Sequence, residues 1–168
     1  MKNIILIGMP GAGKSTVGVI LAKTLGKNFI DTDIAIQEKS GRLLQDIIDT
    51  EGPEAFLDLE EKTLLALDCH NSVIATGGSV VFSGKAMDCL KREGVVVYLK
   101  ISFDEMARRL NNITTRGIVL IAGQSLLDMY RQRIPLYEKY ADITIDGEGG
   151  EFEGIVERVV GEIGGFRR

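Results

Sequence analysis

The stretch Gly8-Met9-Pro10-Gly11-Ala12-Gly13-Lys14-Ser15 decides how the chain folds, because it matches the pattern G-x-x-x-x-G-K-[ST]. Glycines let successive backbone N–H groups turn toward a phosphate, and a following helix adds its positive N-terminal end. Lys14 can reach the β- and γ-phosphates, and the Ser15 hydroxyl can ligate Mg²⁺. The stretch therefore predicts a loop that binds a nucleoside triphosphate, and we call these eight residues the P-loop.

The sequence on either side of the P-loop supports this interpretation. Residues 3–7 form a short apolar run rich in β-branched residues and ended by Gly8, as expected of a buried strand. Residues 14–25 carry apolar side chains at helical spacing and are followed by Gly26, a common helix terminator. Thr16 can extend the phosphate site or be an ordinary first-turn residue. The residues expected to bind the nucleotide here are Gly11, Ala12, Gly13, Lys14, Ser15 and Thr16.

Strands and helices alternate along the rest of the chain. Further apolar strands are expected at 29–30, 72–75, 95–99 and 143–145. Helical patterns cover 34–48 with an interruption at 40–41, then 54–69, 85–92, 103–110, 126–140 with a kink or break at Pro135, and 155–163. Almost wholly apolar strands that alternate with helices predict a parallel sheet covered on both faces. We expect one α/β domain over residues 1–168.

Composition excludes several classes of protein. Twenty Lys and Arg against 24 Asp and Glu give a formal net charge of −4, so a broad basic face for nucleic acid is not expected. Glycine is abundant, at 20 of 168 residues, but no repeat or low-complexity tract accompanies it. Two cysteines make no disulfide framework, no run approaches the length of a membrane span, and the N-terminus lacks a signal-peptide cleavage site. We expect a cytoplasmic protein without nucleic-acid or membrane partners.

Two carboxylates follow the second expected strand, at Asp31-Thr32-Asp33. Open α/β sheets bind ligands at the carboxyl ends of their strands. On an extended segment, residues two apart point to the same side, so one carboxylate can serve Mg²⁺ while the other faces a substrate hydroxyl. Asp33 is also a good N-cap for the helix expected next. The catalytic and capping interpretations are comparable in strength and do not exclude each other.

Taken together, these motifs resemble the shikimate kinase family of small P-loop kinases, and the resemblance covers nearly the whole chain. The matching segments are Gly8–Ser15, Asp31-Thr32-Asp33, Ser40-Gly41-Arg42, 54–61, Thr76-Gly77-Gly78, 96–99, Arg116 and Arg133-x-Pro135-Leu136-Tyr137. The resemblance implies a P-loop kinase fold, three-layer α/β/α, with a five-stranded parallel sheet. It also implies a substrate-binding helical region at 34–61 and a mobile lid at 111–123. The implied reaction transfers the γ-phosphoryl group of the co-substrate ATP to the 3-hydroxyl of shikimate, with Mg²⁺ as cofactor.

The resemblance implies roles for the acidic and glycine residues. Ser15 and Asp31 match the residues at the Mg²⁺ site, and Lys14 keeps its phosphate-binding, catalytic role. Asp33 matches the aspartate that contacts and activates the attacking hydroxyl. Gly77 and Gly78 match the turn whose backbone approaches the substrate.

It likewise implies roles for three arginines. Arg116 matches the lid arginine that meets the phosphates, Arg109 a residue beside adenine, and Arg133 an arginine that binds the shikimate carboxylate. Taken alone, an arginine in a polar loop is usually solvated, and one on a helix often covers apolar neighbours with its stem. Phosphoryl transfer depends on positioning and charge stabilisation, which favours several cations converging on one site.

Three positions depart from the family pattern. Leu57 stands where the family has an arginine that grips the shikimate carboxylate, and leucine offers no hydrogen-bond donor. Ser79 replaces the third glycine of the turn, and Gly117 replaces the proline after the lid arginine. Glu60, which in the family lies near the missing arginine, is left without that partner.

Leu57 keeps two further interpretations open. The chain can be a related P-loop kinase for a different hydroxylated acid or sugar, or a nucleotide-binding module without kinase activity. The joint presence of Lys14, Ser15, Asp31, Asp33 and Arg116 speaks against the second alternative. The leading hypothesis is an ATP-dependent small-molecule kinase that works as a monomer on a hydroxylated metabolite in aromatic amino acid biosynthesis.

Overall fold

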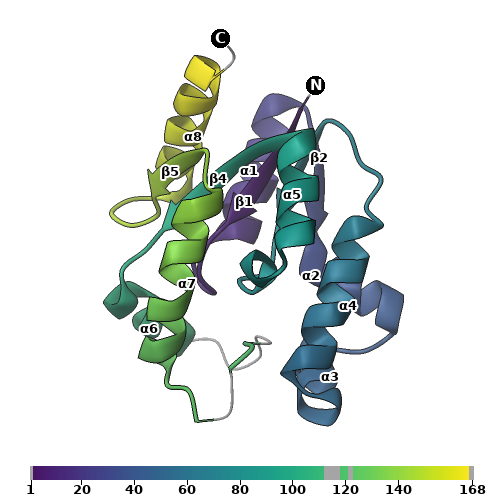
Figure 1. The fold of residues 1–168 in the computed structure, drawn as a ribbon. Coiled ribbons are helices and arrows are strands. Elements are labelled where there is room, and N and C mark those ends of the chain that lie inside the picture. Colours follow the sequence, from purple (N-terminus) through teal and green to yellow (C-terminus); the bar gives the residue numbers. More distant parts are fainter. Residues whose placement is uncertain (1, 112–117, 121–122, 167–168) are drawn as a thin grey trace.

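A parallel sheet organises the part of the chain described by the computed structural model, residues 2–111, 118–120 and 123–166. Its strands run in the order β2-β3-β1-β4-β5, so β1 lies in the centre (Figure 1). Leu6 of β1 lies opposite both Ala75 of β3 and Val97 of β4. The strands are β1 (Asn3–Ile7), β2 (Asn28–Asp31), β3 (Ser72–Ala75), β4 (Gly94–Lys100) and β5 (Ile143–Asp146).

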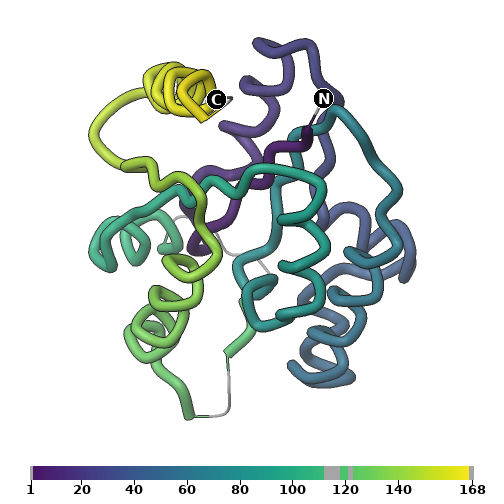
Figure 2. The backbone as a smooth tube through the Cα atoms, turned by 45° about the horizontal axis from the view of Figure 1, so that its top comes forward, coloured from purple at the N-terminus to yellow at the C-terminus, as the bar shows by residue number. Residues whose placement is uncertain are grey.

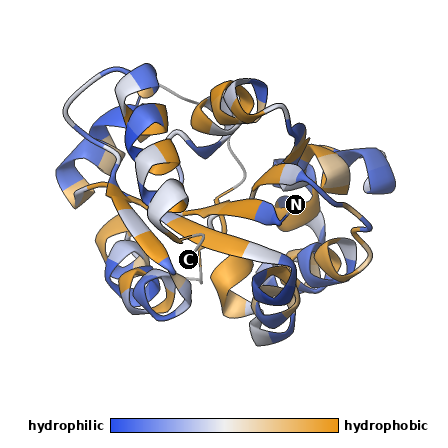
Figure 3. Cartoon of the chain, turned by 90° about the horizontal axis from the view of Figure 1, so that it is seen from above, coloured by the Kyte–Doolittle hydropathy of each residue, from blue (hydrophilic) through white to orange (hydrophobic). Residues whose placement is uncertain are grey.

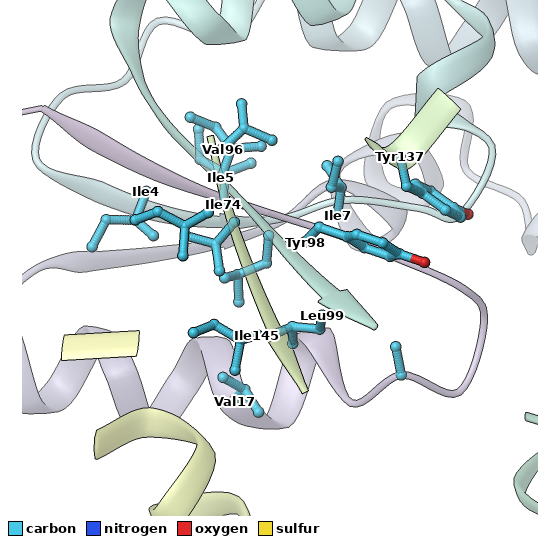
Figure 4. Close-up of a cluster of buried hydrophobic side chains, with 14 of the residues drawn as sticks. Ile4, Ile5, Ile7, Val17, Ile74, Val96, Tyr98, Leu99, Tyr137 and Ile145 are labelled. Carbon is cyan, nitrogen blue, oxygen red and sulfur yellow. The ribbon is translucent and has the colours of Figure 1, made fainter. Parts of the chain in front are cut away.

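Helices cover both faces of this sheet. On one face, α1 (Lys14–Leu25) packs against β2, β3 and α8 (Phe152–Phe166), which also contacts β5. On the other face, α5 (Gly84–Glu93) and α7 (Leu126–Tyr140) pack on β4 and on the short 3₁₀ helix η1 (Val80–Phe82). Figure 4 shows the two faces at the core, with Val17 of α1 on one side of the strands and Tyr137 of α7 on the other. Figure 3 shows apolar residues along the strands between the helices.

A separate group of helices extends beyond the edge strand β2. It contains α2 (Thr32–Ser40), α3 (Leu44–Glu51) and α4 (Pro53–Leu65), which pack on one another, while α6 (Phe103–Asn111) follows β4 on the other side (Figure 1). This group has its own apolar cluster, formed by Ile36, Leu44, Ile47, Phe56 and Val119. Val119 belongs to the segment after α6, so this cluster joins the two sides at the carboxyl ends of the strands.

The structure agrees with the predicted element order and alters some boundaries. The expected break at Pro135 is wrong, because α7 runs continuously through it. The helix expected to reach residue 69 ends at Leu65. Asp31, rather than Asp33, is the N-cap of α2, because α2 begins at Thr32.

Both backbone views place the first and last described residues at the same end of the molecule, away from α6 (Figures 1 and 2). In the described part of the chain, no helix has the length and apolar character needed to cross a bilayer.

Candidate active site

The P-loop leads from β1 into α1, as predicted. Gly13 is the N-cap of α1 with φ near +89°, a conformation that favours glycine, and a Cβ there would lie 2.8 Å from Cε1 of Phe152. The buried Lys14 ammonium donates hydrogen bonds to the carbonyl oxygens of Gly8 (2.7 Å) and Met9 (2.8 Å). Thr16 is exposed on the first turn of α1. The loop thus holds a lysine charge and a helix N-terminus in one place, which suits a phosphate group.

Ser15 and Asp31 lie in contact at the end of the P-loop. The Ser15 hydroxyl donates a 2.7 Å hydrogen bond to Oδ2 of Asp31, while Oδ1 accepts the backbone N–H groups of Asp33 and Ile34. Hydroxyl and carboxylate oxygens are the hard ligands that Mg²⁺ prefers. No group of three or more His, Cys, Asp or Glu side chains suited to a metal occurs among the described residues. The pair fits Mg²⁺ bound by few protein ligands, with water and phosphate oxygens as the others.

A cavity of about 560 Å³ opens beside the P-loop at the carboxyl ends of the strands. Its size is in the range of small-molecule sites. Val119 and Phe56 supply part of its apolar wall, and Gln37 and Ser79 add polar groups. Six residues that the sequence assigned to the site line it together: Lys14, Ser15, Asp33, Gly77, Gly78 and Arg133.

Asp33 and Glu60 approach the same point of the cavity wall. A Cβ added to Gly77 would lie 2.8 Å from Oδ1 of Asp33 and 2.8 Å from Oε2 of Glu60. Only glycine lets the backbone pass this close to two carboxyl groups. The premise that residues 31–33 are extended is wrong, since the first turn of α2 brings Asp33 to the cavity.

Glu60 lies beside the cavity wall at Gly77, although it is not among the lining residues and the family resemblance gave it no role beyond its place near the missing arginine. Its side chain is buried on α4, and Oε1 accepts a 2.8 Å hydrogen bond from the Ser79 hydroxyl. Burial raises the pKa of the Glu60 carboxyl to about 7, partly offset by the Ser79 hydrogen bond, while the Asp33 charge raises it further. Besides the family resemblance, its place on the buried face of α4, in line with Phe56 and Thr63, is a signal that identifies it.

Arg133 supplies a buried cation to the same cavity. It is 2% exposed, its Nη2 donates a 2.7 Å hydrogen bond to the Val119 carbonyl, and its guanidinium carbon lies 5.4 Å from the centre of the Phe82 ring. A Cβ added to Gly78 would lie 2.9 Å from Nη1. Such a cation is suited to a carboxylate, because a planar guanidinium pairs with two oxygens at once.

Arg109 lies on the outer side of the P-loop. Its Nη1 donates to the Gly11 carbonyl at 2.9 Å and its Nη2 to the Gly147 carbonyl at 3.0 Å. It is therefore tied to the loop rather than placed in the cavity with Arg133. Its predicted place beside adenine stays a prediction.

The remaining predictions concern the lid and Leu57. Arg116 and Gly117 lie outside the described residues, as does most of the predicted lid at 111–123. Leu57 lines a second cavity of about 540 Å³, which shares Val119 with the first. We call these the main cavity and the side cavity.

The fold and the site define the class of protein. A parallel sheet with a P-loop, a hydroxyl and a carboxylate in contact beside that loop, and an adjoining cavity with an aspartate and two cations are the parts of a P-loop phosphotransferase. A family model described as shikimate kinase matches residues 10–164. The chain belongs to the shikimate kinase family, and it is an ATP-dependent phosphotransferase that acts on a hydroxyl group.

Individual relatives agree with this assignment. The chain is 38% identical over 165 residues to a shikimate kinase of Thermodesulfovibrio yellowstonii, covering 96% of this chain and 95% of the relative. It is 42% identical over 147 residues to one of Mycobacterium avium, covering 84% of this chain and 82% of the relative. The solved shikimate kinase of Acinetobacter baumannii in complex with shikimate has a TM-score of 0.91 and 32% identity, covering 99% of this chain and 95% of that one. These findings give no support to the alternative functions.

Proposed function

We propose that the chain phosphorylates the 3-hydroxyl of shikimate and that the main cavity holds this substrate. The observation that carries the proposal is the arrangement in one cavity of Lys14 at the P-loop, Asp33, and Arg133. These three residues suit a hydroxy acid as substrate. The substrate hydroxyl would face the ATP phosphates and the Asp33 carboxylate, and the substrate carboxylate would face the Arg133 guanidinium. The shikimate complex of the Acinetobacter baumannii relative supports the choice of substrate.

Asp33 is the group proposed to receive the proton of the reacting hydroxyl. The hydroxyl oxygen forms a bond to the γ-phosphorus, the bond between that phosphorus and the bridging oxygen of ADP breaks, and the hydroxyl proton passes to the Asp33 carboxylate. The P-loop and Lys14 hold the phosphates in line for this displacement. Because the transition state carries charge on the transferred oxygens, the Lys14 ammonium stabilises it.

Ser15 and Asp31 are the residues proposed to hold Mg²⁺. Bound there, Mg²⁺ would neutralise charge on the β- and γ-phosphates. Asp31 keeps Oδ2 toward Ser15 because Oδ1 is engaged by the α2 N-terminus. Arg116 is proposed to complete the site from the lid.

Arg133 is proposed to bind the shikimate carboxylate in the main cavity. It is the one arginine among the described residues that line this cavity. Leu57 faces the side cavity and adds no second cation. We therefore propose a carboxylate site with a single arginine.

A coupled ADP-release assay tests the proposed substrate. Shikimate is compared with other hydroxylated acids and with sugars at saturating ATP and Mg²⁺. We expect turnover with shikimate to exceed that with the other compounds. Turnover with another compound and none with shikimate would overturn the assignment.

Leu57→Arg tests the single-arginine site. Leu57 lies on α4 next to Phe56, which lines the main cavity, and it packs against the apolar cluster that contains Val119. An arginine at position 57 can therefore add a second hydrogen-bond donor for the carboxylate. We expect a lower KM for shikimate and an unchanged KM for ATP. An unchanged or higher KM for shikimate would mean that position 57 does not reach the carboxylate.

A further inference from the structure

A buried carboxyl group and a buried guanidinium lie on either side of the Gly77-Gly78 turn without pairing among the described residues. Glu60 and Arg133 are each 2% exposed, yet no ion pair joins them in the described part of the chain. Oε2 of Glu60 and Nε of Arg133 have no hydrogen-bond partner among the residues that the structure describes. Burying unpaired charges is costly, so the separation needs a physical cause.

The turn and Ser79 keep the two groups apart. Oε2 of Glu60 lies against the α-carbon of Gly77 and Nη1 of Arg133 against that of Gly78. The Ser79 hydroxyl, in the next position, donates the one hydrogen bond that the described residues give to the Glu60 carboxyl. Arg133 is held on its own side by the Val119 carbonyl and the Phe82 ring.

The ionisation of Glu60 agrees with this separation. A carboxylate in a tight ion pair has a lowered pKa. The pKa of Glu60 is instead raised to about 7, mainly by burial, and the Arg133 charge lowers it less than the Ser79 hydrogen bond does. The other charged groups that act on Glu60 are Asp33 on α2, which raises its pKa, and Lys14 on α1, which lowers it.

We propose that Ser79 is a positioning residue for substrate binding, which holds Glu60 away from Arg133 so that the guanidinium stays free for the carboxylate of the substrate. This inference rests on the proposed function, because it assumes an acidic substrate in the main cavity. With Leu57 facing the side cavity, Arg133 is the arginine on which the carboxylate depends among the described lining residues. A Glu60–Arg133 ion pair would compete directly with the substrate.

Ser79→Ala is the first test. Without its hydroxyl donor the Glu60 carboxyl is free to turn toward Arg133, so the KM for shikimate should rise about tenfold, the scale of one hydrogen bond to a charged group. We expect kcat to change less than about twofold and the KM for ATP to stay constant. Ser79→Thr, which restores the hydroxyl, should bring the KM for shikimate back to within about threefold of the original.

Ser83→Ala is the matched control. The Ser83 hydroxyl also donates to a carboxyl of α4, that of Glu61, but neither residue lines the main cavity. Removing it should leave the KM for shikimate unchanged. Thermal unfolding of each variant separates a folding defect from a change in the site.

The double variant Ser79→Ala/Glu60→Gln separates positioning from a merely structural role. A neutral glutamine cannot form the competing ion pair, so Ser79→Ala should raise the KM less than about twofold in the Glu60→Gln background. An equal rise in both backgrounds would overturn the proposal, as would an unchanged KM in Ser79→Ala alone.

A crystal structure of ligand-free Ser79→Ala decides the proposal independently of turnover. We expect Glu60 and Arg133 within ion-pair distance in that variant, and groups that remain apart would overturn the inference. If the unaltered chain neither binds nor phosphorylates shikimate, the proposed function falls, and this structure still decides the role of Ser79.

Discussion

Asp33 is the residue that receives the proton of the reacting hydroxyl in the proposed mechanism. Asp33→Asn keeps the shape of the side chain and removes the proton acceptor, so we expect kcat to fall about 10²–10³-fold. The KM for ATP should change little, because the P-loop is untouched. Steady-state kinetics with each substrate measures both values.

Asp58→Asn is the matched control for this substitution. Asp58 is exposed on α4, away from the main cavity. Its kinetics should equal those of the unaltered chain. A kcat of Asp33→Asn within about threefold of that value would contradict the role of Asp33 as proton acceptor.

Glu60 should make the stability of the fold depend on pH. Its pKa is about 7 in the folded chain, against an ordinary value of 4.5, so between these values the folded state holds a proton that the unfolded state has lost. The stabilisation is complete below about pH 4.5 and is lost as pH rises toward 7. In the unaltered chain this effect lowers the free energy of unfolding by on the order of 3 kcal/mol at most. We expect Glu60→Gln to remove this decrease.

Urea unfolding at several pH values between about 4.5 and 8 measures this effect. Glu54→Gln, an exposed change on the same helix, should keep the slope of the unaltered chain. Equal slopes in Glu60→Gln and the unaltered chain would show that Glu60 keeps an ordinary pKa.

The residues of the site were predictable to the extent that they belong to motifs. Lys14 and Ser15 follow from the P-loop pattern alone, and Arg133 follows from the family resemblance. The contact between Ser79 and Glu60 was not predictable, because the two residues are 19 positions apart and only the packing of α4 against the turn brings them together. Hydrogen bonds between distant polar side chains leave no periodic signal in a sequence.

At the scale of a single element, Asp31 connects the N-terminus of α2 with the proposed metal site. It caps α2 with Oδ1 and contacts Ser15 with Oδ2. Asp31→Ala should remove both functions and lower the free energy of unfolding by about 1 kcal/mol. Asp31→Asn should keep the cap, because asparagine caps as well as aspartate, and lose only the charge.

The two variants are compared by thermal unfolding and by the Mg²⁺ concentration that gives half-maximal activity. Both should need more Mg²⁺ than the unaltered chain, while only Asp31→Ala should unfold at a lower temperature. An unchanged Mg²⁺ requirement in both would contradict the assignment of Asp31 to the metal site.

The ends of helices and strands were predicted correctly only where the residue pattern marks them clearly. β1 and α1 have the predicted bounds, because an apolar run and a helical pattern meet at the glycines of the P-loop. The start of α2 was missed because Asp31 and Asp33 are equally good caps by residue type. Pro135 does not break α7, since burial of Arg133 and Tyr137 on either side holds this segment against the core.

At the scale of the whole molecule, segments from the middle and from the last part of the sequence contact the P-loop. Phe152, the first residue of α8, packs against Gly13, and Arg109 links the loop to Gly147 in the segment before α8. The proposed nucleotide side of the site is therefore built from the P-loop after β1, α6 and the C-terminal segment. The proposed substrate side includes residues of α2, α4 and α7, and the two sides meet at the cavity that Lys14 lines.

This division predicts that a substitution on one side changes the KM for one substrate and leaves the KM for the other unchanged. Phe152 is 38% exposed beside the P-loop, so its ring can support the loop and offer a flat surface to a base. Phe152→Ala should raise the KM for ATP about threefold to tenfold and leave the KM for shikimate unchanged. Phe166→Ala removes a ring of similar exposure, 50%, from the far end of the same helix and should change neither value. A parallel rise in both KM values for Phe152→Ala would mean that α8 supports the whole fold rather than the nucleotide side.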